Sequence, residues 1–228
     1  MKLINFHTHN YQCKTNSICI ESVDYNAHFN PNGNSFYTLG IHPWSSDNAN
    51  AIQSLNLLKE HLNHPNVIGI GEIGLDRLKG ASLDKQIELL IKQLDIAVEA
   101  NLPVVLHCVR CWSEIISIFK KPKYKNLTKA IHGFRSKPEI AKELINENFY
   151  LSFGTSLIDA TPELAEALTI TPPDKRFFET DDKNIPIYEV YDAAADFLDT
   201  TFEQLVSETN SNLKSFFKET LKLQLLPI

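Results

Sequence analysis

The chain has 228 residues, a length that fits one large domain or two small ones. Its hydrophobic share of 43% and charged share of 22% are those of an ordinary globular protein with enough apolar sequence for a sizeable core. The formal net charge of -6 disfavours non-specific adhesion to nucleic acid or to an anionic membrane, although a local phosphate pocket or a metal remains compatible with it.

The beginning of the chain, "MKLINF", lacks the apolar h-region of a signal peptide. No apolar run approaches the roughly 18 residues that a membrane span needs. The four cysteines are too few for a disulfide scaffold in a chain of this length. We therefore expect a cytoplasmic protein that does not associate with membranes, and we favour a monomer.

Eight short stretches carry the apolar, β-branched and aromatic residues that are typical of strands. They are residues 2–6, 17–23, 36–41, 66–73, 102–108, 129–134, 149–154 and 176–181. Most of those after residue 40 alternate with helical patterns. Residues 84–100 have apolar side chains at the spacing of one helix face, and helices are also predicted at 112–120, 136–147, 161–168, 187–198 and beyond residue 210.

Alternation of strands and helices predicts a parallel sheet with helices outside it. Eight strands of this kind predict an α/β fold, a (β/α)8 TIM-type barrel that occupies residues 1–228 as a single domain. The front of the chain departs from this plan, because no convincing helix separates the first and third strands and a parallel crossover usually needs a dozen or more residues. The second strand could therefore pair antiparallel or be irregular, and we expect a barrel that lacks one or two helices near the N-terminus.

Imidazoles and carboxylates recur at the C-terminal ends of the predicted strands, where barrel enzymes assemble their active sites. Such side chains are ligands for borderline divalent cations. A single histidine at a strand end is more often structural, but the shared position on so many strands favours a metal site. The residues are His7, His9, His42, Glu72, Asp76, His107, His132 and Asp181.

Six motifs in this order, "NFHTH", "LGIHP", "GEIGLD", "PVVLH", "IHGF" and "ETD", resemble those of the TatD-type metal-dependent hydrolases. This family is a branch of the amidohydrolase-like barrels and includes deoxyribonucleases, and the resemblance runs from residue 4 to about residue 182. It implies two divalent metal ions (Zn, Mn, Mg or similar). One ion would be held by His7, His9, Glu72 and Asp181, and the other by Glu72, His107 and His132, with Glu72 bridging.

The resemblance also implies hydrolysis of phosphodiester bonds at DNA ends, or of another phosphoester, by a metal-activated water. Asp181 and Glu72 would be the catalytic residues, with Asp181 orienting the water or taking its proton. Three residues, His42, Arg110 and Arg135, would contact substrate phosphate. Asp76 would contact the metal ligands without binding a metal ion itself.

Several positions differ from the family pattern or have a simpler interpretation. Asn5 stands where the family usually has Asp, and the arginine expected two residues after His107 comes one residue later, at Arg110. His42 could merely pack in the turn before Pro43, and Asp76 could be a loop or helix-cap carboxylate.

The pair Cys108 and Cys111 forms a CxxC without a second such pair, so we predict neither metal binding nor redox chemistry there. Two other functions stay open. One is a barrel metal hydrolase that acts on a small phosphoester, an amide or a lactone. The other is a non-catalytic metal-binding relative.

Overall fold

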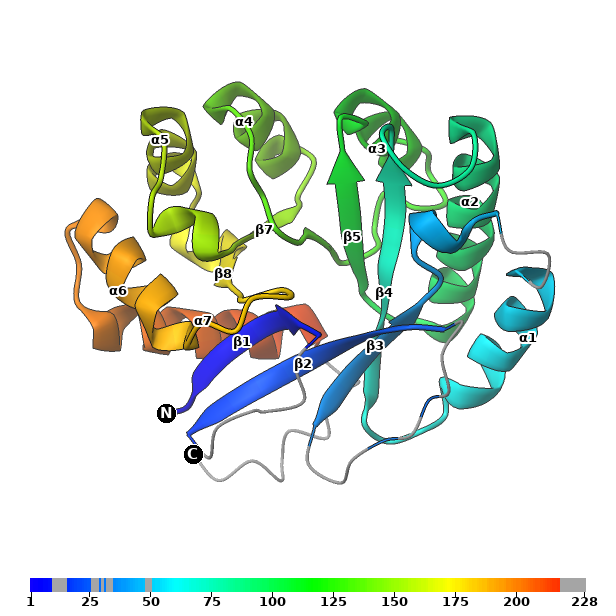
Figure 1. The fold of residues 1–228 in the computed structure, drawn as a ribbon, viewed down its shortest axis with the longest axis horizontal. Coiled ribbons are helices and arrows are strands. Elements are labelled where there is room, and N and C mark those ends of the chain that lie inside the picture. The colour runs from blue at the N-terminus through cyan, green and yellow to red at the C-terminus, as the bar shows by residue number, and fades with distance from the viewer. Residues whose placement is uncertain (10–15, 26–28, 30, 32–34, 48–50, 218–228) are drawn as a thin grey trace. The chain divides into compact units, whose positions relative to one another are not determined.

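The structure, a computed structural model, describes residues 1–9, 16–25, 29, 31, 35–47 and 51–217. Eight strands form one sheet in the order in which they occur along the chain (Figure 1). The strands are β1 (Leu3–Thr8), β2 (Ser17–Asp24), β3 (Phe36–Gly40), β4 (Val67–Asp76), β5 (Val104–Val109), β6 (Lys129–Ile131), β7 (Tyr150–Phe153) and β8 (Arg176–Phe178).

Helices follow most of the strands (Figure 1). They are α1 (Ala51–His61), α2 (Leu83–Ala100), α3 (Trp112–Phe119), α4 (Pro138–Asn146), α5 (Pro162–Ile170), α6 (Ile187–Leu198) and α7 (Phe202–Phe217), with 3-10 turns η1 (Pro43–Ser45), η2 (Thr155–Leu157) and η3 (Pro173–Lys175). A parallel sheet in chain order with alternating helices is the topology of the (β/α)8 TIM-type fold, so the predicted fold class is confirmed. No helix within the described ranges is long and apolar enough to cross a membrane.

All eight predicted strands are present, and the five helices predicted between residues 84 and 198 correspond to α2 to α6. The helix α1 was not predicted, and α7 begins at Phe202, earlier than expected. The strand β2 pairs parallel with β1, so the antiparallel alternative is wrong. The register of this pairing shifts between Asn5 and Thr8, so β2 pairs irregularly, which was the other possibility. Among the described residues, no helix lies between β1 and β3, as predicted.

The chain divides into two compact units, which are described separately. The first unit comprises Met1–Glu21 and Ala130–Ile228, and the second unit comprises Ser22–Lys129. The single domain over residues 1–228 stays a prediction.

In the first unit, α7 covers β1 and β8 with an aromatic core. The ring of Phe6 on β1 stacks on that of Phe177 on β8 with centroids 4.1 Å apart, and Phe216 of α7 meets Phe6 edge-on. All three side chains are buried. The amide of Asn210 on α7 also donates to the carbonyl of Lys2, at 2.8 Å. Burial of these large aromatic rings stabilises this end of the chain.

In the second unit, β4 is buried along all ten of its residues and lies between β3 and β5. Gly74 allows β4 to approach β5 closely, because a Cβ at this position would lie 2.0 Å from the carbonyl oxygen of His107. Gly74 also has a φ of +147°, which side chains rarely adopt. This close approach brings the acidic residues of β4 beside His107 on β5.

Candidate metal centre

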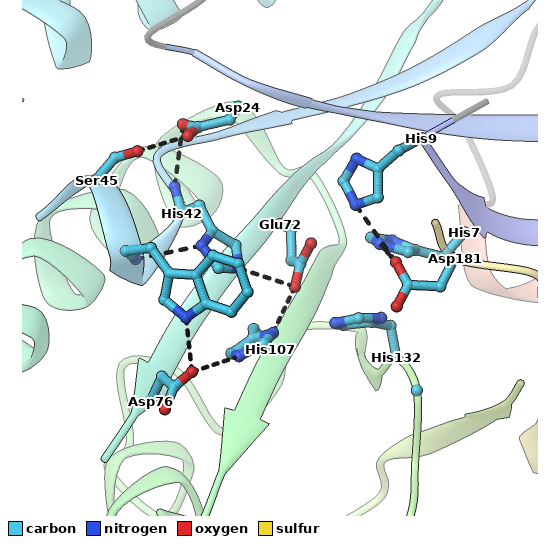
Figure 2. A network of polar contacts seen from close by, with 12 residues as sticks. His7, His9, Asp24, His42, Ser45, Glu72, Asp76, His107, His132 and Asp181 are labelled. Carbon is cyan, nitrogen blue, oxygen red and sulfur yellow. Dashed lines mark hydrogen bonds and ion pairs between the residues drawn. The ribbon is translucent and has the colours of Figure 1, made fainter. Parts of the chain in front are cut away.

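In the first unit, backbone hydrogen bonds of Asp181 join the segment after β8 to β1. The Asp181 N–H donates to the carbonyl of His7 at 3.0 Å, and the His9 N–H donates to the carbonyl of Asp181 at 3.2 Å. Asp181 has a φ of +53°, a left-handed conformation that Asp tolerates better than most residues. Its Oδ1 consequently lies 3.8 Å from His7 Nε2 and 3.5 Å from His9 Nε2 (Figure 2).

His132 lies directly after β6, and its ring stacks on that of His7 with centroids 4.0 Å apart. His132 Nδ1 lies 3.2 Å from Oε1 of the buried Glu179, which also accepts the Gly133 N–H at 2.7 Å. Because a carboxylate only accepts, the proton of this contact belongs to His132 Nδ1 and the lone pair to Nε2. A carboxylate behind a histidine is the usual way in which proteins orient a metal ligand.

We call His7, His9, His132 and Asp181 the first cluster. Three of them, His7, His132 and Asp181, each offer a ligand atom within 4.8 Å of the other two. His7 and His132 are buried, whereas the side chains of His9 and Asp181 are 39% and 41% exposed. The first cluster therefore combines deep imidazoles with a carboxylate that solvent and substrate can reach.

The second unit brings together His42 after β3, Glu72 and Asp76 on β4, and His107 on β5 (Figure 2). We call these four residues the second cluster. Glu72 Oε1 lies 2.6 Å from His107 Nδ1 and 3.2 Å from His42 Nε2. The residues His42, Glu72 and His107 also offer ligand atoms that lie within 4.8 Å of one another.

The tautomer of His42 follows from its neighbours. Its Nδ1 accepts the backbone N–H of Trp44 at 3.2 Å, so Nε2 carries the proton and donates to Glu72. The backbone N–H of His42 donates to Asp24, which also accepts from Ser45 (Figure 2). His42 thus lies within the second cluster, and its contact with substrate phosphate stays a prediction.

Asp76 supports both His107 and the loop after β4. Its Oδ2 lies 2.6 Å from Trp44 Nε1 and 3.4 Å from His107 Nε2, and its Oδ1 accepts the Leu78 N–H at 2.7 Å. Burial acts to raise the pKa of Asp76, but the hydrogen bonds from Trp44, Leu78 and His107 outweigh it and hold the pKa below its usual value. The carboxylate is therefore ionised behind His107, as a supporting residue requires.

Two glutamines of α2 fasten the strand ends that carry the second cluster. Gln93 binds both backbone groups of Ile41, which precedes His42, with distances of 2.7 and 3.1 Å. Gln86 binds both backbone groups of Asp76, with distances of 2.8 and 2.9 Å. Neither glutamine is among the residues predicted from the sequence, although two polar residues seven positions apart within an apolar helix face are a signal. Glu179, within the motif "ETD", is likewise not among them.

The arginines predicted to contact substrate are both exposed. The chain turns at Arg110, which has a φ of +55° directly after β5 and whose carbonyl accepts from Arg77 Nε at 2.9 Å. Arg135 lines a cavity of about 570 Å³ between the loops that precede α4 and α5. The substrate contacts of Arg110 and Arg135 stay predictions.

The thiols of Cys108 and Cys111 are free, and burial raises the pKa of both. Reactive and metal-binding cysteines need the opposite shift, because the thiolate is the active form. The lack of chemistry at this pair stays a prediction.

The donors of the two clusters fit divalent metal ions. The first cluster offers imidazole nitrogens and one carboxylate, and the second offers the carboxylate of Glu72 and the imidazole of His107, with His42 beside them. Neutral imidazole with carboxylate is a ligand set for Zn, Mn and similar ions. Each cluster also contains a histidine whose second nitrogen contacts a buried carboxylate, Glu179 or Asp76. The sharing of Glu72 between two ions stays a prediction.

Comparison with known proteins points to one family. The family model described as "TatD related DNase" matches residues 10–218. The chain is 29% identical to the "Uncharacterized metal-dependent hydrolase YabD" of Bacillus subtilis over 198 residues, which are 80% of this chain and 77% of that protein. It is 30% identical to the "3'-5' ssDNA/RNA exonuclease TatD" of Citrobacter koseri over 152 residues, which are 63% of this chain and 56% of that protein.

Solved structures share the fold. The TatD homologue YJJV from Escherichia coli superposes with a TM-score of 0.78 at 18% identity, covering 94% of this chain and 97% of that chain. A TatD family hydrolase from Entamoeba histolytica superposes with a TM-score of 0.77 at 16% identity, covering 95% of this chain and 98% of that chain. Together with the family model, these findings show that the chain belongs to the TatD related DNase family of metal-dependent hydrolases.

Proposed function

We propose that this protein is a phosphodiesterase of the TatD type, a deoxyribonuclease that removes nucleotides from DNA ends. The observation that carries the proposal is the presence, in each unit, of an imidazole–carboxylate cluster at the ends of parallel strands. The name of the Citrobacter relative, an exonuclease for single-stranded DNA and RNA, supports the same substrate class.

In this proposal the ligands of the two divalent ions are the six residues that the family resemblance assigns to them, His7, His9, Glu72, His107, His132 and Asp181. When bound, such ions lower the pKa of a water and neutralise charge on the attacked phosphate. The residues of the chain would then hold the metal ligands in place, take a proton from the attacking water and bind the substrate.

Asp181 is suited to take the proton from the attacking water. Its carboxylate is 41% exposed, and its backbone is held to β1 on both sides. A fixed carboxylate that solvent reaches can accept a proton from a water beside it. Glu179 and Asp76 hold the rings of His132 and His107. The Nε2–H of His42, which donates to Glu72 in this structure, would donate to a phosphate oxygen in its place once substrate is bound.

The net charge of -6 is compatible with DNA as a substrate if the contacts are few and local. A strand end needs only a few phosphate contacts, whereas a wrapped duplex needs many. We therefore expect slow exonuclease activity with a shallow dependence on salt, because log affinity falls in proportion to the number of counterions released.

The test begins with metal content. Purified protein should bind up to two divalent ions, and Glu72→Ala should lose most of this binding. Glu166→Ala, a change of an exposed residue on α5, is the matched control and should bind as the wild type does. Unchanged metal content in Glu72→Ala would contradict the role of Glu72.

Activity is tested by digesting end-labelled single strands and closed circular DNA side by side with Mn, Mg and Zn. We expect cleavage of the single strands and slower or no cleavage of the circles. If neither DNA is cut with any ion while a small phosphoester, amide or lactone is hydrolysed, the nuclease proposal fails and the small-molecule hydrolase replaces it. Metal binding without any hydrolysis would indicate a non-catalytic relative.

A further inference from the structure

Two large hydrophobic side chains lie exposed beside the second cluster. The indole of Trp44 is 48% exposed and Leu78 is 60% exposed. Both residues donate hydrogen bonds to Asp76. Its Oδ2 accepts Trp44 Nε1–H at 2.6 Å, and its Oδ1 accepts the Leu78 N–H at 2.7 Å. We call Trp44 and Leu78 the apolar step. Exposed apolar surface next to a polar site is a common mark of a binding surface.

Hydrogen bonds position Trp44 and the turn that carries it. The backbone N–H of Trp44 donates to His42 Nδ1, and the 3-10 turn η1 fixes the adjacent backbone. The side chain of Ser46, directly after this turn, accepts the Ala81 N–H at 3.1 Å, which ties the turn to the loop after β4. A pre-ordered aromatic ring loses little conformational entropy when a ligand stacks on it.

The surroundings of Trp44 indicate the kind of ligand. Its ring centroid lies 4.7 Å from that of His42 and 5.9 Å from that of His107, so a group on the indole is next to the second cluster. The ammonium of the exposed Lys79 lies 3.9 Å from the indole centroid. A flat, aromatic ligand with a nearby negative charge matches both features, since a base can stack on the indole ring and the ammonium of Lys79 can donate to a phosphate.

We infer that Trp44 stacks the base of a nucleotide at the end of a single strand, with Lys79 contacting a phosphate of the same strand. This inference rests on the proposed function and adds a base-binding position to it. Stacking of a base on an aromatic side chain is stronger than an exposed cation–π contact, so a base can displace Lys79 from the ring. A base inside a duplex is already stacked on both faces, which is why the position favours single strands.

The direct test is tryptophan fluorescence. The chain has two tryptophans, so Trp112→Phe leaves Trp44 as the single reporter. We expect a thymidine oligonucleotide to quench this fluorescence, and an oligonucleotide with an abasic end to quench it far less. Binding of the thymidine oligonucleotide, measured by anisotropy, without quenching would overturn the inference.

The energetic test pairs Trp44→Leu, which removes the aromatic face, with Trp44→Phe, which keeps an aromatic face but loses the indole N–H to Asp76. We expect Trp44→Leu to weaken oligonucleotide affinity roughly 5- to 150-fold, and Trp44→Phe to weaken it clearly less. The loss in Trp44→Leu should nearly vanish with the abasic oligonucleotide. Equal losses in the two variants, or a loss that persists with the abasic end, would show that Trp44 acts only through Asp76.

A substrate without a base separates this inference from the proposed function. If the wild type hydrolyses bis(p-nitrophenyl) phosphate and cuts DNA while the Trp44 variants bind oligonucleotides normally, the base position is wrong and the nuclease proposal stands. If the wild type cuts no DNA but the Trp112→Phe variant still shows quenching that depends on the terminal base, the base position stands and the nuclease proposal fails. If the oligonucleotide does not bind at all, both are wrong.

Discussion

Replacement of Asn5 by alanine should destabilise the protein substantially, because Asn5 makes a two-way contact with Thr180. The Asn5 Oδ1 accepts the Thr180 N–H at 3.0 Å, and the Asn5 Nδ2 donates to Thr180 Oγ1 at 2.8 Å. The two residues are only 6% and 3% exposed. Since Thr180 lies between Glu179 and Asp181, this contact holds the segment after β8, which carries the candidate metal ligand Asp181, against β1.

The magnitude follows from the groups involved. Each hydrogen bond contributes about 1 kcal/mol net, and a buried N–H left without an acceptor costs about 1–3 kcal/mol. These contributions overlap, so we expect Asn5→Ala to lower the free energy of unfolding by about 2–4 kcal/mol. Asn5→Asp, the residue usual in the family, should lose less, because a carboxylate can accept from both the N–H and the hydroxyl of Thr180.

The assay is equilibrium unfolding in urea, followed by circular dichroism, with the change taken from the midpoint at a constant slope. Asn63→Ala changes an exposed asparagine and should stay within about 0.5 kcal/mol of the wild type. A loss below about 1 kcal/mol in Asn5→Ala would refute the reasoning. So would an Asp variant that is as unstable as the Ala variant.

Three further predictions follow from single contacts. Glu179→Ala should weaken metal binding about 10- to 100-fold because His132 loses its orienting carboxylate, and Glu179→Gln should weaken it less, as measured by competition with a chelating dye; equal affinity in Glu179→Ala and wild type would contradict this. Burial and the carboxylate of Asp95 raise the pKa of Tyr124 to about 12, so its stabilisation is present below the ordinary value of 10 and is lost as the pH rises from 10 to 12. Unfolding curves from pH 9 to 12 should therefore fall more steeply for the wild type than for Tyr124→Phe, and parallel curves would argue against the shift. Cys111→Ser should keep metal content and activity within about twofold of the wild type, since a buried thiol with a raised pKa is not a ligand, and a large loss in either assay would reverse that conclusion.

The sequence alone was sufficient to locate the strands along the chain and to select candidate ligands at their ends, because both depend on local patterns. Alternation of apolar runs along the chain reports which residues are buried, and this predicted all eight strands and the helices α2 to α6. The place of a histidine or an acid at the end of such a run is equally local, as for His7, His107 and His132. The helix α1 was not predicted, although its segment, "AIQSLNLLKEH", has apolar residues at the helical spacing of positions 52, 55 and 58.

The tertiary structure decided which groups meet, because hydrogen-bond partners are chosen across the fold and not along the chain. Glu179 contacts His132, which is 47 residues away in the sequence, and Gln93 hydrogen-bonds to Ile41, which is 52 residues away. The parallel pairing of β2 was likewise decided by its neighbour in the sheet, since its own residues suit either direction. The residue pattern of a strand predicts that a side chain is buried, but only the packed structure specifies which carboxylate contacts which imidazole.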